Sequence, residues 1–213
     1  MNRVVFLVDG FNVYHSLRQA IRDSGETLKW LDLHALCNSY VQSSLFGEAG
    51  VLERVIYFSA YAAFLSSSKP GVVARHRTYV TALQATGVDV VMGRFKWKPR
   101  WCPTCKRETP GHEEKETDVS IAVHLIELFV TDACETAVLV TGDTDLLPAI
   151  AAARRLSSGR AIWIGFPYKR LNQELRLVAD GHFRIRRQAY ARHQLPDLLK
   201  LPDEAMVRKP AGW

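Results

Sequence analysis

Carboxylates follow two apolar runs of the sequence, where they could bind a metal. Asp9 comes directly after the run at 4–8, and Asp143 and Asp145 follow the run at 137–142. Each run has the continuous apolar character of a strand buried in a parallel sheet. Crowded carboxylates repel one another, and Mg²⁺ or Mn²⁺, which prefer carboxylate oxygens and retained water, relieve that repulsion. A local alternative stays open: Asp143 or Asp145 caps the helix that follows, and Asp9 ends a strand.

A fourth acid lies on an apolar helical stripe. The pattern at 115–131 predicts a helix whose buried stripe contains Ala122, Leu125, Ile126 and Phe129. Asp118 precedes Ala122 by four residues, so the 3.6-residue period places it at the N-terminal end of that stripe. Burying a carboxylate costs free energy unless it is paired or bound to a metal. Asp118 is therefore predicted to need a cation, near the strand ends that carry the other acids.

A metal held by carboxylates suits phosphodiester hydrolysis, because it activates water and neutralises charge on the leaving oxygen. The sequence shows no Ser-His-Asp set at a nucleophile elbow, no Walker lysine and no dinucleotide glycine fingerprint. A phosphatase with an aspartate nucleophile would need a DxD pair after the first strand, where this chain has Asp9-Gly10-Phe11. His15 and His124 could assist catalysis, although a single helical histidine is more often structural.

Cys102 and Cys105 have the CxxC spacing with which two thiolates bind one zinc ion. One such pair is half of a site, and the candidates for further ligands are His112, then Glu108 or Glu113. An unmetallated hairpin stays open, whereas redox chemistry is disfavoured because a thioredoxin-like CxxC opens a helix. The other two cysteines are predicted to be ordinary buried residues: Cys37 and Cys134.

Basic and aromatic side chains surround the CxxC pair. Basic residues pair with phosphates and aromatic faces stack on unpaired bases, so this stretch is the best candidate for an arm that binds single-stranded nucleic acid. Its candidate residues are Arg94, Lys96, Trp97, Lys98, Arg100 and Trp101. Lys169 and Arg170 follow a later predicted strand and are expected at the same sheet edge as the acids. The alternative for Trp97, together with Phe95, is that both end a strand and pack in the core.

Charge is unevenly distributed along the chain. Residues 1–150 hold 15 Lys and Arg against 17 Asp and Glu, and residues 151–213 hold 13 against 5. An acidic part joined to basic stretches suits a polyanionic partner whose chemistry occurs at carboxylates. Simple solubility is the competing explanation.

Strand-like and helical patterns alternate along the chain, which predicts an α/β fold with a parallel sheet and helices on both faces. The predicted domain covers 1–187, with the Cys-containing basic insertion at 96–113. A polar, loosely ordered extension is predicted for 188–213. The apolar runs are too short for a membrane span, and the N-terminal residues do not form a signal peptide, so a cytoplasmic protein is expected.

Three segments resemble the signature segments of the NYN nucleases, which are PIN-like, metal-dependent ribonucleases. They are FLVDGFNVYHS at 6–16, EEKETDVSIAVHLIELF at 113–129 and VLVTGDTDLLPAI at 138–150. The resemblance implies a PIN-like (Rossmann-like) sheet of about five strands and RNA as the substrate, and it allows a homodimer. It also implies that Mg²⁺ or Mn²⁺ is held by Asp9, Asp118, Asp143 and Asp145 and that Asn12 orients water or a phosphate. The expected function is endoribonuclease, and the alternative is a catalytically silent RNA-binding module of the same fold.

Overall fold

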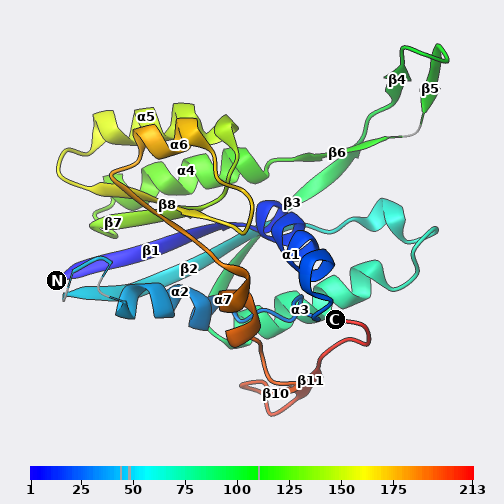
Figure 1. Ribbon diagram of the computed structural model, residues 1–213, viewed down its shortest axis with the longest axis horizontal. Coiled ribbons are helices and arrows are strands. Elements are labelled where there is room, and N and C mark those ends of the chain that lie inside the picture. Colours follow the sequence, from blue (N-terminus) through cyan, green and yellow to red (C-terminus); the bar gives the residue numbers. More distant parts are fainter. Residues whose placement is uncertain (44, 48, 110) are drawn as a thin grey trace.

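A seven-stranded sheet forms the centre of the molecule in the computed structural model, which describes residues 1–43, 45–47, 49–109 and 111–213 (Figure 1). The strand order is β6-β3-β2-β1-β7-β8-β9, and each neighbouring pair is parallel except β3 and β6. The expected α/β class with a parallel sheet is confirmed, but the sheet is larger than the five strands predicted. The strand bounds are β1 Asn2–Asp9, β2 Gly50–Ala60, β3 Val88–Trp97, β6 His112–Lys115, β7 Thr136–Val140, β8 Ala161–Phe166 and β9 Gly181–Arg184.

Helices cover both faces of the sheet (Figure 1). Along β1, Val4, Phe6 and Val8 join one buried cluster, whereas Val5 and Leu7 join the other, as the two-residue period of a strand requires. The first face is covered by α1 Gly10–Ser24, α2 Leu33–Gln42 and α3 Val72–Ala85. The second is covered by α4 Thr117–Val130, α5 Leu147–Leu156 and α6 Gln173–Val178.

The strand order brings the predicted acids toward one edge. β1 lies between β2 and β7, and Val8 pairs with Val140, so the residues after β1 and β7 emerge side by side. β6 runs back antiparallel to β3, so α4 begins at the carboxyl edge of the parallel strands. Ligands of open α/β sheets bind beyond this edge, where the chain connections diverge to either side.

The Cys-containing basic insertion predicted at 96–113 begins as a β-ribbon that continues β3. β3 extends to Trp97 and pairs with β6 from Arg94 opposite Lys115 to Trp97 opposite His112. A short hairpin of β4 Arg100–Cys102 and β5 Arg107–Thr109 follows, and the whole arm projects away from the domain (Figure 1). Cross-strand hydrogen bonding orders this segment although its apolar content is low.

The C-terminal residues pack against the domain, so the prediction of a loosely ordered extension was wrong. After α7 Arg187–Arg192, the antiparallel pair β10 Leu198–Lys200 and β11 Met206–Arg208 follows. Trp30 Nε1 donates to the carbonyl of Pro196 at 2.8 Å, and the rings of Trp30 and Trp213 lie 6.3 Å apart. Aromatic packing thus holds a tail whose composition is mostly polar. No helix in the described part of the chain is long and apolar enough to cross a membrane.

Candidate functional site

Three of the four predicted acids gather at the carboxyl edge of the sheet. Carboxylate oxygens of Asp118, Asp143 and Asp145 all lie within 4.8 Å of one another. Asp118 is in the first turn of α4, while Asp143 precedes a short 3-10 helix, η2 Thr144–Leu146, that contains Asp145. Asp143 Oδ1 also accepts a hydrogen bond from the N–H of Asp145 at 3.1 Å. Asp143 therefore caps η2, as the alternative interpretation expected, and also belongs to the cluster of acids.

Asp9 lies beside this cluster and is engaged by the protein itself. Its side chain is 3% exposed, and burial raises its pKa. The N–H of Asn12 donates to Oδ1 at 3.0 Å, and Thr141 Oγ1 donates to Oδ2 at 2.9 Å. Asp9 is therefore the N-cap of α1.

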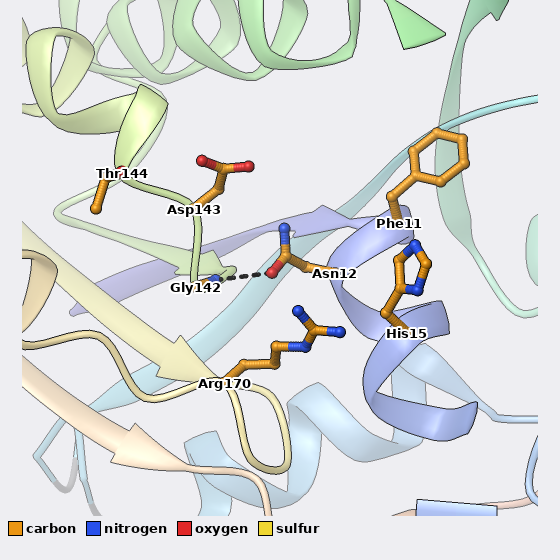
Figure 2. Close-up of a pocket in the computed structure, with 7 residues that line it drawn as sticks. All are labelled: Phe11, Asn12, His15, Gly142, Asp143, Thr144 and Arg170. Atoms are coloured by element: carbon orange, nitrogen blue, oxygen red, sulfur yellow. Dashed lines mark hydrogen bonds between the residues drawn. The ribbon is translucent and has the colours of Figure 1, made fainter. Parts of the chain in front are cut away.

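Asn12 connects the ends of β1 and β7. Its Nδ2 donates to Oδ2 of Asp9 at 2.6 Å, and its Oδ1 accepts from the N–H of Gly142 at 3.2 Å (Figure 2). Gly10 permits this arrangement, because a Cβ at that position would lie 2.5 Å from the carbonyl oxygen of Phe58. The side-chain amide of Asn12 is thus held in one orientation, because its nitrogen and its oxygen each form a hydrogen bond within the protein.

Negative charge is concentrated around Asp118. Its pKa is raised to about 6 by burial first, and then by Asp9, Asp143, Glu114 and Asp145. Glu114, at β6, was missed as a member of this group, although the run EEKETD placed it four residues before Asp118. It accepts hydrogen bonds from the N–H and Oγ1 of Thr117. A cation bound near Asp118 would relieve the repulsion among these carboxylates, which the described protein groups do not offset.

A pocket of about 380 Å³ opens beside Asp143 (Figure 2). It is lined by Phe11, Asn12, His15, Gly142, Asp143, Thr144 and Arg170. The pKa of His15 is lowered by burial and by the nearby guanidinium groups of Arg170 and Arg18, which favours the neutral imidazole. The pocket is therefore lined by the carboxylate of Asp143 and also by the guanidinium group of Arg170.

The segment that carries Arg170 is fixed by α1 and by the end of β7. Ser16 Oγ donates to the carbonyl of Tyr168 at 3.0 Å, and it lies 2.9 Å from Tyr190 Oη. A Cβ on Gly142 would meet the carbonyl oxygen of Arg170 at 2.4 Å, so only glycine allows this approach. Lys169 does not join Arg170 at the pocket wall, because its Nζ pairs with Asp23 at 2.8 Å.

The predicted RNA-binding residues of the arm are mostly exposed, and several are already paired. Arg94 pairs with Glu116 and Lys98 pairs with Glu113, and exposed pairs of this kind contribute little to stability. Trp97 and Trp101 are 63% and 61% exposed, so packing in the core does not explain Trp97. Lys96 is also exposed, and the side chain of Arg100 lies outside the described part of the structure.

The CxxC pair lies at the end of the arm. Hydrogen bonds to the sulfur of Cys102 lower its pKa and so favour a thiolate. The largest effect comes from the N–H of Cys105, followed by the side chain of Cys105 and then by Thr104. Among the described residues, no histidine, further cysteine or acid lies close enough to both Cys102 and Cys105 to form a three-ligand group with them. His112, the predicted third ligand, instead stacks on Phe64 with ring centroids 4.1 Å apart.

The remaining cysteines and histidine behave as structural residues. Cys37 and Cys134 are buried, as predicted, and burial raises the pKa of the Cys134 thiol to about 11. His124 Nδ1 lies 2.8 Å from the carbonyl of Ser120, and its ring packs edge-on against Phe58. Neither group takes part in the acidic site.

A sequence model of the NYN domain matches residues 3–190. The chain belongs to the NYN domain family. NYN domains are generally nucleases that act on RNA, and the acidic triad could hold a divalent metal in keeping with that chemistry.

Two further relatives were found for this NYN domain. The chain is 26% identical to "6-hydroxy-3-succinoylpyridine 3-monooxygenase HspA" of Pseudomonas putida (strain DSM 28022 / S16), across 99% of this chain and 75% of the relative. It resembles the crystal structure of a protein of unknown function, VPA0982, from Vibrio parahaemolyticus RIMD 2210633. That match has a TM-score of 0.57 and 18% identity, and covers 86% of this chain and 93% of the other. The structural likeness bears on the fold alone.

Proposed function

We propose that this NYN domain is a metal-dependent endoribonuclease. The observation that carries the proposal is the acidic triad at the sheet edge, with carboxylate oxygens of three aspartates within 4.8 Å of one another and a pocket beside them that Arg170 lines. Hydrolysis of a phosphodiester needs positive charge near the phosphate and a positioned water, and this arrangement can supply both.

The donor set fits a hard divalent cation. The triad offers only carboxylate oxygens, which suits Mg²⁺ or Mn²⁺ better than zinc. The raised pKa of Asp118 reflects crowded negative charge in a half-buried place, which a bound cation would offset. When bound there, a divalent cation would activate water and neutralise charge on the leaving oxygen. Asp118, Asp143 and Asp145 would hold it.

Neighbouring side chains would orient the substrate. Arg170 faces the pocket and would pair with a phosphate oxygen of the RNA chain. Asn12, fixed by Asp9 and Gly142, holds the end of β7 in place and so keeps Asp143 at a set distance from β1. His15, with its lowered pKa, is neutral near pH 7 and can receive a proton at the pocket wall.

The test is cleavage of a labelled single-stranded RNA with Mg²⁺, with Mn²⁺ and with EDTA. Internal cuts in the presence of metal that disappear with EDTA would support the proposal. Binding without cutting under every metal condition would contradict it and favour the catalytically silent RNA-binding module.

The monooxygenase relative supplies one comparison for the same experiment. An enzyme of that class consumes O₂ and an electron donor, so hydroxylation of 6-hydroxy-3-succinoylpyridine is assayed alongside RNA cleavage. The site offers no dinucleotide glycine fingerprint after β1, where the chain reads Asp9-Gly10-Phe11-Asn12. Product formation from the pyridine without RNA cleavage would overturn the nuclease proposal.

Within the same proposal, Cys102 and Cys105 contribute two thiolates to a structural zinc ion that shapes the end of the arm. The turn favours a Cys102 thiolate, and thiolates suit zinc, so this metal is distinct from the one at the acidic triad. With two cysteines in the turn, the remaining ligands would be water or groups brought in by substrate or a second chain.

Changing both cysteines to serine is expected to weaken RNA affinity several-fold while leaving the cleavage rate at saturating RNA nearly unchanged. The reason is that the β4–β5 hairpin, which carries both cysteines at the end of the arm, projects away from the domain and would act on binding (Figure 1). Elemental analysis and RNA titrations check this, with Pro103→Ala as the control that keeps both thiols. Purified protein without zinc, or an unaltered affinity in the double variant, would contradict it.

A further inference from the structure

The β-ribbon of the arm has two chemically different faces. Successive residues of a strand point to opposite sides, and residues directly opposite each other in an antiparallel pair share a side. Phe95 and Trp97 therefore share one side with their partners Glu114 and His112. The other side is charged, and Lys98 and Lys115 both pair with Glu113 there. The basic and aromatic residues that alternate in the sequence thus do not form one mixed surface.

The aromatic side is continued by rings from two other elements. Phe95 lies between Phe11 of α1, at 5.6 Å between ring centroids, and Phe64 of the 3-10 helix η1 Ala63–Leu65, at 4.9 Å. Phe64 in turn stacks on His112 with an interplanar angle of 9°. We call these five residues the aromatic face: Phe11, Phe64, Phe95, Trp97 and His112.

The aromatic face leads directly into the acidic site. Phe11 lines the pocket that also contains Asp143 and Arg170. At the other edge of the face, Glu114 accepts a hydrogen bond from the N–H of Thr117, the residue before Asp118. The rings other than Trp97 are only partly buried, and Trp97 is 63% exposed, so ring surface faces solvent along this line.

We propose that the aromatic face stacks the bases of unpaired nucleotides that adjoin the nucleotide held at the acidic triad. This inference rests on the proposed function and names the form of its substrate: a single strand whose bases are free to stack. In a duplex those bases are already stacked on one another and the ring faces would have no partner. Continuity with the pocket favours this occupant, because Phe11 and Arg170 line the same pocket and the aromatic face extends from Phe11 to Phe95 and beyond.

Packing within the protein accounts for only part of this face. The stack of Phe64 on His112 also fixes η1 against the ribbon, which by itself would be a structural role. Trp97 has no such role, because more than half of its surface is exposed and it comes after Phe95 on the same side of β3. An exposed indole in line with a catalytic pocket is suited to a base.

The test measures binding of single-stranded oligoribonucleotides to the full chain in buffer without added Mg²⁺ or Mn²⁺, so that the RNA is not cut and any zinc at the CxxC pair is retained. Two probes are compared, one intact and one in which abasic residues replace the bases but every phosphate remains. Trp97→Ala is expected to weaken binding of the intact strand about tenfold, the size of one base–aromatic stack, and to leave binding of the abasic strand unchanged. The same variant should not affect binding of a duplex.

Leu177→Ala is the matched control, because it removes an 84% exposed apolar side chain from α6. Phe64→Leu provides a second measurement, which retains bulk at η1 and removes the ring. Equal losses on the intact and abasic strands, or no loss on either, would overturn the aromatic face as a base site. Failure of the nuclease proposal is separate: base-dependent binding without cleavage under any metal would leave the aromatic face standing and remove the catalytic function.

Discussion

Replacing Asp143 with asparagine is expected to lower the rate of RNA cleavage by about a thousandfold while the protein stays folded. The change removes one negative charge from the triad, where the oxygens of three aspartates lie within 4.8 Å. It leaves the local structure intact, because asparagine is as good an N-cap as aspartate and its Oδ1 can still accept from the N–H of Asp145. Single-turnover cleavage at saturating RNA, together with circular dichroism, measures both parts of the prediction.

Asp203→Asn is a closely matched control. Asp203 Oδ1 accepts from the N–H two residues later, at Ala205, at the same 3.1 Å distance as Asp143 to Asp145. That turn lies between β10 and β11, away from the acidic site. Cleavage by Asp143→Asn at the wild-type rate would show that the site is misassigned, and unfolding of the variant would mean that the charge of Asp143 has a structural role.

Asp118→Asn is expected to stabilise the metal-free protein and to abolish its stabilisation by Mg²⁺. Ionised Asp118 is destabilising in the fold because burial and four neighbouring acids oppose its charge. After allowance for solvent screening of a half-exposed group, removing that charge should raise the free energy of unfolding by about 1 kcal/mol. For a domain of this size, that corresponds to roughly 2–4 °C in melting temperature.

Thermal melts in EDTA and in Mg²⁺ near pH 7.5 test this. The wild type should gain about 2.7 kcal/mol when Mg²⁺ is at 100 times its Kd, and the variant should gain much less. Glu127→Gln, which removes an exposed carboxylate near the other end of α4, is the control and should change neither melt. A large loss of metal-free stability in Asp118→Asn would indicate instead that Asp118 has a structural partner.

The pH dependence of this effect has a defined sign. The pKa of Asp118 is 3.8 in an unperturbed chain and about 6 in the fold, so between these values the folded protein binds the extra proton. The contribution of Asp118 to metal-free stability should therefore fall as pH rises from about 4 to 6, and then level off. The difference between the variant and the wild type should vanish below pH 4 and be complete above pH 6. Mg²⁺ binding should weaken as pH falls below about 6, because protons then compete for the carboxylate.

Local sequence patterns were sufficient to place the acids on their elements. Continuous apolar runs end at Asp9 and just before Asp143, and the helical period places Asp118 on the inner side of α4. These assignments depend on periodicity and burial over a few neighbouring residues, which are properties of the chain itself. The family resemblance added RNA as the substrate, and the match to residues 3–190 confirms the family.

Contacts between distant segments could not be derived in this way. Asp9 was predicted as a metal ligand from its strand alone, and its hydrogen bond from Thr141, 132 residues away, was not part of that prediction. Glu114, which was missed, enters the site through the return of β6, whereas Arg170 was expected at this edge and the fold brings its carbonyl against Gly142. Each of these contacts depends on how strands are ordered in the sheet, which no local pattern encodes.

The β-ribbon arm and the C-terminal residues after α7 likewise have some features that the sequence predicted and others that only the tertiary structure set. Their composition correctly indicated charge and few core residues, but it left open whether Trp97 and Phe95 pack in the core, it did not predict a β-ribbon, and it suggested a loosely ordered extension. Pairing of β3 with β6 orders the first, and packing of Trp213 against Trp30 orders the second. The sequence by itself determined which residues carry charge, which face inward and where strands end. Only the tertiary structure decided which strand ends meet and which side of the ribbon faces the acids, because hydrogen bonding and packing between segments far apart in the chain set those distances.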